Sequence, residues 1–226
     1  MVVSVHIPKC AGTSFRHALR QIHGSGLWLN YGDDFRREAV PPGTTCIHGH
    51  FSADAYDGII PGRKLITIVR HPVERVVSNY HHFLRIPDLR NQASVRLHTE
   101  RLTLLQFARL ESVRNEIVGY TAGKTPGDFA WIGLAERYAE SLVLLRKKFG
   151  ISAPMTAIRD NVNPDRKNPR YDLPSHEYDE ILSLNAADMV WYAKACSHFD
   201  ALRLSFVSQP NELERTIARF MSQVAL

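Results

Sequence analysis

Cysteine is scarce in this chain, and this scarcity argues against stabilisation by disulfide bonds or by structural zinc. Only Cys10, Cys46 and Cys196 occur among 226 residues. Because the number is odd and no C-x-x-C pair is present, we expect neither a disulfide framework nor a structural zinc site. No convincing Cys/His ligand set is visible, so no metal is expected. A reduced, cytoplasmic setting fits this composition best.

Long apolar runs are also missing. No stretch approaches 18 uninterrupted apolar residues, so we expect no membrane span. The first residues, MVVSVHIPK, lack the basic and apolar regions of a signal peptide. Repeats and low-complexity tracts are absent as well. The length predicts one domain over 1–226, with 85–128 as a helical insertion on the substrate side.

The charge of the chain is modestly positive, at +5. Such an excess suits a nucleotide, a nucleic acid, an acidic sugar or a membrane surface, and composition does not choose among them. A zinc finger, an aromatic RNA-binding signature and a helix-turn-helix pattern are all missing, so nucleic acid is not the expected partner.

Short β-rich segments alternate with amphipathic stretches along the chain. The sequence predicts strands at 2–7, 44–48, 64–69 and 129–134, and helices at 13–22, 72–84, 103–110, 136–149, 174–184, 186–202 and 210–224. The region 24–43, rich in glycine, proline and charge, is predicted to be loop. This alternation indicates an α/β fold with a mostly parallel sheet and helices on both faces.

The segment HIPKCAGTSF follows the first predicted strand and opens the first helix. Backbone amides of a small-residue loop can wrap an anion, and a helix N-terminus adds partial positive charge. Lys9 supplies a full charge, and the Thr13 and Ser14 hydroxyls can donate. The lysine precedes the small residues, so this is not the G-x-x-x-x-G-K-[ST] phosphate loop. The alternative is an ordinary strand-turn-helix with Thr13 as the N-cap.

A second candidate anion site, VRHPVERVVSNY, follows the strongest predicted strand. Arg70 stands at the strand end, where its planar fork can hold a phosphate with two bonds, and Ser78 lies on the helix that Pro72 opens. A surface arginine and a solvent-facing serine are the alternatives. Both segments fall at carboxyl ends of strands, where open α/β sheets bind ligands. One ligand with two separated anionic groups would suit both.

Together the two segments resemble the signature loops of the PAPS-dependent sulfotransferases, as P-K-x-x-x-T-S and R-x-P-x-x-R-x-x-S-x-Y. The resemblance implies a P-loop-NTPase-like three-layer fold and PAPS as the sulfuryl donor. It implies that Arg70 and Ser78 hold the 3′-phosphate. The residues implied to bind the 5′-phosphosulfate are Lys9, Cys10, Ala11, Gly12, Thr13 and Ser14.

Two later segments are similar to carbohydrate sulfotransferases, including the heparan-sulfate 2-O type. WIGLAERYAESLVLL, from Trp131, looks like a segment after their variable region, and NVNPDRKNP looks like their C-terminal nucleotide loop. The resemblance makes Asn163, Arg166 and Lys167 candidates for closing over the donor. A solvated basic loop is the alternative there.

Sulfuryl transfer needs a base for the acceptor hydroxyl, and histidine suits that role near neutral pH. The segment CIHGHF follows a short predicted strand and resembles the H-G-H segment of the heparan 2-O-sulfotransferases. The resemblance implies that His50 is the base, that His48 assists it, and that Lys9 neutralises the bridging oxygen. Alternatively, one histidine packs structurally and the other meets solvent.

The sequence thus predicts a metal-independent transfer of a sulfuryl group from PAPS to a hydroxyl of a carbohydrate. Two other classes stay open. An ATP-dependent P-loop kinase is disfavoured by the order of the lysine and the small residues, and by the lack of a clear magnesium-binding acidic residue after a strand. A non-catalytic polyanion binder would account for the basic charge alone.

Overall fold

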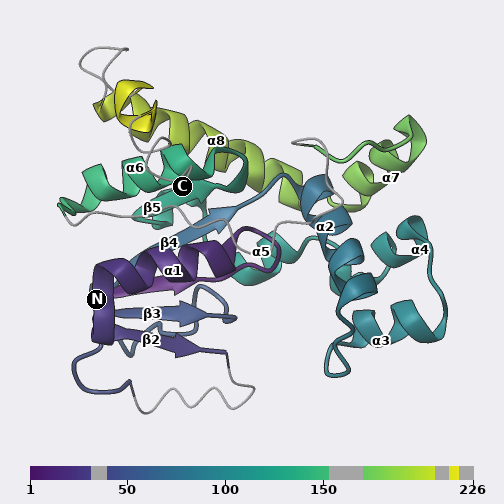
Figure 1. The fold of residues 1–226 in the computed structure, drawn as a ribbon, viewed down its shortest axis with the longest axis horizontal. Coiled ribbons are helices and arrows are strands. Elements are labelled where there is room, and N and C mark those ends of the chain that lie inside the picture. Colours follow the sequence, from purple (N-terminus) through teal and green to yellow (C-terminus); the bar gives the residue numbers. More distant parts are fainter. Residues whose placement is uncertain (32–39, 153–169, 207–213, 219–226) are drawn as a thin grey trace.

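The computed structural model describes residues 1–31, 40–152, 170–206 and 214–218. These residues build a sheet with helices on both sides (Figure 1). Its strands are β1 (Val2–Val5), β2 (Leu27–Asn30), β3 (Cys46–Gly49), β4 (Lys64–Val69) and β5 (Trp131–Leu134). The strand order is β2-β3-β1-β4-β5, and every neighbouring pair is parallel. The expected three-layer α/β fold is confirmed.

The central position of β1 decides where ligands can bind. Val5 near its end pairs with Gly49 on β3 and with Thr67 on β4. Because all three strands run in the same direction, the segments that follow them emerge side by side at one edge of the sheet. The chain leaves β1 toward β2 and β3 on one side and later adds β4 and β5 on the other. Such a switch point is where open α/β sheets form a binding crevice.

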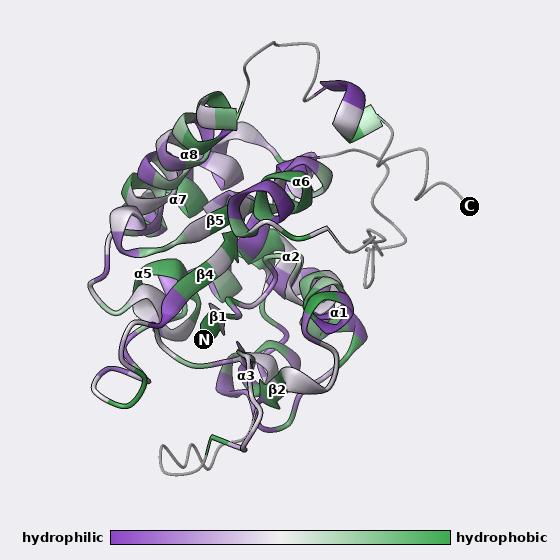
Figure 2. Cartoon of the chain, turned by 90° about the vertical axis from the view of Figure 1, so that its left-hand side faces the viewer, coloured by the Kyte–Doolittle hydropathy of each residue, from purple (hydrophilic) through white to green (hydrophobic). Residues whose placement is uncertain are grey.

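Eight labelled α-helices accompany the sheet in the described ranges, besides a short helical stretch at 214–218: α1 (Gly12–His23), α2 (Pro72–Arg85), α3 (Gln92–Thr99), α4 (Leu104–Ala108), α5 (Glu116–Thr121), α6 (Tyr138–Phe149), α7 (Ser175–Leu184) and α8 (Ala186–Phe206). Figure 2 shows α1 and α6 on one side of the sheet and α5 and α8 on the other. Helices α3, α4 and α7 gather around α2, away from the sheet (Figure 1). None of the helices described is long and apolar enough to cross a bilayer.

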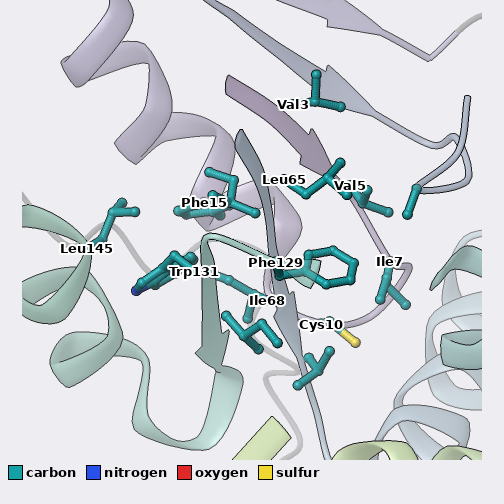
Figure 3. Packing of buried hydrophobic residues seen from close by; sticks show 14 of the residues in the cluster. Val3, Val5, Ile7, Cys10, Phe15, Leu65, Ile68, Phe129, Trp131 and Leu145 are labelled. Atoms are coloured by element: carbon teal, nitrogen blue, oxygen red, sulfur yellow. The ribbon is translucent and has the colours of Figure 1, made fainter. Parts of the chain in front are cut away.

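The main core lies between the sheet and its covering helices. The rings of Phe15 on α1 and Trp131 on β5 stack with centroids 5.4 Å apart (Figure 3). Two charged residues tie the outer helices together, since the buried Arg75 on α2 forms an ion pair with Glu116 on α5 and donates to the Val113 carbonyl at 2.6 Å. These contacts hold α2, which carries the second candidate anion site, against the rest of the molecule.

The structure corrects one prediction and leaves others untested. Residues 24–43 are not loop throughout, because Leu27–Asn30 forms the edge strand β2. The structure also contains helices α3 and α5, which the sequence did not predict. Of the helix predicted at 210–224, only 214–218 is described, and it is helical. The division into one domain with an insertion at 85–128 stays a prediction.

Candidate functional site

The segment between β1 and α1 begins with a tight turn. The Cys10 amide donates to the Ile7 carbonyl at 3.3 Å, and Lys9 has a φ of 63°. With Pro8 before Lys9, this is the pattern of a type II turn. Ala11 also has a φ of 63°. Because a left-handed non-glycine residue costs about 1–3 kcal/mol, this loop keeps its shape only through its surroundings.

Helix α1 starts in a way that suits an anion. Its first turn has no acidic residue and no side-chain cap. The first bond of the helix runs from the Phe15 amide to the Ala11 carbonyl at 3.0 Å. Gly12, Thr13 and Ser14 therefore form the N-terminal turn, where the helix dipole is positive. A phosphate or sulfate group in front of this turn would be stabilised by amides and dipole together.

Lys9 stands in a strongly positive environment. Burial first, and then the charges of Arg70 and Arg85, lower the pKa of its ammonium to about 8. Arg70 follows β4 and Arg85 ends α2, so three elements bring cations to one place. The mutual repulsion of these cations would be relieved by a bound anion.

Arg70 is held in a fixed orientation beside the loop of Lys9. Its Nη1 approaches the Lys9 carbonyl at 3.5 Å, and its Nη2 donates to Glu74 Oε2 at 3.1 Å. The other carboxylate oxygen of Glu74 accepts from the Tyr171 amide at 2.9 Å. The Tyr171 ring centroid is 5.8 Å from the guanidinium carbon. The structure thus brings the two predicted anion sites together on one side of the molecule.

Ser78 lies on the same face of α2 as residues that meet this site. Glu74, Ser78 and His82 are spaced by four residues, which aligns them along one side of a helix. Glu74 contacts Arg70, and the pKa of His82 is lowered to about 4 by burial and next by the charge of Lys9. Ser78 is therefore positioned between two residues that face the site. The predicted donor-closing residues Asn163, Arg166 and Lys167 lie outside the described residues.

Three histidine rings stack beside the ends of β1 and β3. The His6 ring is 4.3 Å from the His50 ring, with planes at 22°. On its other side, the His6 ring is 5.0 Å from the His48 ring, with planes at 11°. His50 is exposed and His48 is buried. The two histidines of the H-G-H segment are thus joined through a third one, which the sequence did not single out.

The hydrogen bond of His50 determines which nitrogen can take a proton. Its Nδ1 lies 3.0 Å from the His6 carbonyl oxygen, which can only accept. Nδ1 therefore carries the hydrogen, and the neutral ring keeps its lone pair on Nε2. Although His50 is exposed overall, the His6 and Tyr31 rings packed against it partly bury the imidazole and lower its pKa, and the bond to the His6 carbonyl offsets part of that effect. His50 is accordingly neutral and able to act as a base near pH 7.

His48 occupies a different environment. It is 1% exposed, and its Nδ1 is 2.9 Å from Ser4 Oγ. Burial lowers its pKa to about 3, although the backbone of Gly12 and Ser4 acts in the opposite direction. His48 therefore stays neutral and out of solvent, and its ring meets those of His6 and Tyr31, which both also meet the His50 ring.

Cys10 differs from its neighbours in the loop. Its side chain is 1% exposed and lies within the apolar core (Figure 3). Burial raises the pKa of its thiol to about 12, which removes nucleophilic character at neutral pH. Its amide already donates to Ile7. Cys10 thus helps to shape the turn and offers little to a ligand.

Sequence reasoning missed three residues of the site. His6 is the central ring of the stack, and Tyr31 hydrogen-bonds to its Nδ1 at 2.8 Å. Glu74 orients Arg70, and the four-residue spacing of an Arg–Glu pair could have indicated it. No local pattern indicates His6 or Tyr31. Among the described residues, no group of three or more His, Cys, Asp or Glu side chains could hold a metal ion.

A comparison with protein-family models agrees with the resemblance that the two anion loops carry. A model described as "Sulfotransferase family" matches residues 1–115, while no curated protein matches. Among solved structures, mouse sulfotransferase SULT7A1 complexed with PAP is 15% identical and has a TM-score of 0.44, over 97% of this chain and 88% of that one. A sulfotransferase from Alicyclobacillus acidocaldarius is also 15% identical with a TM-score of 0.44, over 89% of this chain and 98% of that one. Since the family model spans half of the chain and includes both anion loops, the protein belongs to the sulfotransferase family.

Proposed function

We propose that this chain transfers a sulfuryl group from PAPS to a hydroxyl of a carbohydrate acceptor, with His50 as the general base. One observation carries the proposal: β1 lies between β3 and β4, so His50, Lys9 and Arg70 follow three adjacent strand ends. Neighbouring strands are about 4.8 Å apart. A base, a site for the transferring group and a second phosphate site can therefore share one crevice.

The described residues fit a donor with two anionic groups. We assign the 5′-phosphosulfate to Lys9, Ala11 and the first turn of α1, and the 3′-phosphate to Arg70 and Ser78. Glu74 already orients Arg70, so little side-chain freedom is lost on binding. Asn163, Arg166 and Lys167 would add cover from the segment outside the described residues.

The chemistry requires one proton transfer and one exchange of bonds at sulfur. The acceptor hydroxyl gives its proton to His50 Nε2 while its oxygen bonds to sulfur. The bond between sulfur and the bridging phosphate oxygen breaks, and the electron pair stays on the departing phosphate. Lys9 stabilises this growing negative charge. His48, whose pKa is about 3, takes no proton and supports the ring stack instead.

The carbohydrate acceptor is supported by the similarity of His48-Gly49-His50 to the heparan-sulfate 2-O enzymes. Arg16 on α1 and Arg85 on α2 add positive charge near the histidine stack and Lys9, respectively. An acceptor with acidic groups would benefit from both. We propose that residues 85–128, which hold α3 to α5, contribute to the choice of acceptor.

The pH dependence of kcat/KM for PAPS should be bell-shaped, because this constant reports the ionisation of the free enzyme. The acid limb should have its midpoint below the usual histidine value of about 6.5, since burial lowers the pKa of His50. The basic limb should fall near pH 8, where Lys9 loses its charge. In Lys9→Arg the basic limb should move to higher pH. An unchanged basic limb, or PAP affinity that stays constant above pH 8 in the wild type, would contradict the role of Lys9.

A thermal-shift titration followed by a transfer assay tests the function. Adenosine 3′,5′-bisphosphate (PAP) without magnesium should stabilise the protein by about 2.7 kcal/mol at 100 times its Kd. Labelled PAPS should then pass its label to at least one member of a glycan panel. A shift with magnesium-ATP alone would favour a kinase. A shift with heparin alone, fading as salt rises, would favour a polyanion binder.

A further inference from the structure

His6 is enclosed on several sides, although it belongs to neither of the two recognised histidine positions. Its ring lies between those of His48 and His50. Its Nδ1 is 2.8 Å from the Tyr31 hydroxyl. On the remaining edge, a Cβ atom placed on Gly12 would be 1.7 Å from His6 Nε2. The ring can occupy this position only because residue 12 is glycine.

The backbone of His6 also grips the end of β3. Its amide donates to the Gly49 carbonyl at 2.9 Å, and its carbonyl accepts from His50 Nδ1 at 3.0 Å. His6 therefore fixes the backbone at Gly49, just before His50. It also fixes which nitrogen of the His50 ring carries the hydrogen, and it covers one face of the His50 ring. Orientation of a base by a neighbouring group is a general requirement for efficient proton transfer.

We propose that His6 is a positioning residue for His50, which holds the ring in one orientation with Nε2 left as the proton acceptor. This inference rests on the proposed function, because it takes His50 as the base. Tyr31 and Gly12 hold His6 in turn: the hydroxyl fixes one edge of the ring, and the missing Cβ leaves room for the other. The donor loop and the base are thereby joined through a single side chain.

His6 acts by shape and not by charge. Its pKa lies well below the usual histidine value, first because of burial and then because of His50 and His48. The other charged or titratable groups around the stack are Arg16 on α1, Lys9 in the donor loop, Tyr31 after β2 and Tyr120 on α5. A neutral His6 between these groups shields His50 from water without adding a charge.

Replacing His6 with alanine should lower kcat by about 10–100-fold, the scale on which misplaced catalytic groups cost rate. PAP affinity should stay within about twofold of the wild type. Removing the ring admits water to His50, so its pKa should rise and the acid limb of the kcat profile should move to higher pH. A histidine NMR titration of His50 measures the same rise directly. Tyr31→Phe keeps the packing and removes only the hydroxyl, so it should show the same changes in weaker form.

The double variant separates this inference from the base assignment. If His6 acts through His50, adding His6→Ala to His50→Ala should cost no further activity, because no base remains to be oriented. His23→Ala is a matched control, since His23 contacts Thr45 at the far end of α1. An additional loss in the double variant, or wild-type kcat and pH profile in His6→Ala, would overturn the inference alone. Full activity in His50→Ala would instead overturn the base assignment.

Discussion

Replacing His50 with alanine should lower kcat by about 10²–10⁴-fold, the usual contribution of a general base. The reason is that Nε2 of the exposed ring is the nitrogen left with a lone pair, since Nδ1 is bound to the His6 carbonyl. PAP affinity should stay within about twofold, because His50 follows β3 and the proposed phosphate residues follow β1 and β4. Steady-state kinetics and calorimetric titration of PAP measure the two effects separately.

Two controls strengthen this prediction. His23→Ala removes a histidine whose Nδ1 lies 2.9 Å from Thr45 Oγ1, and it should behave as the wild type. Imidazole added to His50→Ala should restore part of the rate if only a base is missing. A His50→Ala variant with full turnover would show that another group takes the proton.

Lys9→Ala should reduce kcat by about 10²–10³-fold, as the loss of one group that stabilises developing charge typically does. Alanine and lysine have the same backbone preferences at a φ of 63°, so the type II turn should survive the change. The free protein should be as stable as the wild type or more stable. The folded pKa of Lys9, about 8, lies below its usual value, so its charge opposes folding at neutral pH.

Loss of turnover with an unchanged or raised Tm would therefore identify Lys9 as a functional residue. Lys194→Ala, which removes an exposed lysine of α8, is the matched control for charge. A Lys9→Ala variant that keeps its turnover would remove the lysine from the mechanism. A large fall in Tm would show that the lysine holds the loop together, contrary to its repulsion from Arg70 and Arg85.

The sequence predicted the parts of the site that depend on local patterns. A strand followed by a short loop and a helix is readable from a few residues, as at Lys9 and at Arg70. Parallel strands then bring their carboxyl ends to one edge, which is a general rule and needs no coordinates. The sequence could not predict that β1 lies between β3 and β4, because strand order depends on pairing between distant segments.

Other features escaped prediction because they depend on contacts across the fold. The edge strand β2 has only four residues, and its end meets Gly49, where a Cβ atom would lie 1.6 Å from the Asn30 carbonyl oxygen. His6 acquires its place from rings that are 42 and 44 positions away along the chain. Neither contact leaves a periodic signal in the sequence.

The shared use of one nucleotide by two anion loops can be tested with a pair of ligands. Calorimetry would compare PAP with adenosine 5′-phosphate, which lacks the 3′-phosphate, on the wild type and on Arg70→Ala. In Arg70→Ala, the Glu74 carboxylate loses the arginine that neutralises it and would repel the nucleotide. Adding Glu74→Gln removes this negative charge, so the double variant reports the loss of the Arg70 contact alone. The wild type should bind PAP more tightly than adenosine 5′-phosphate by more than about 10-fold, or about 1.4 kcal/mol. Both variants should lose most of this preference, and they should bind adenosine 5′-phosphate nearly as tightly as the wild type does. The same preference for PAP in all three proteins would contradict a 3′-phosphate site at Arg70.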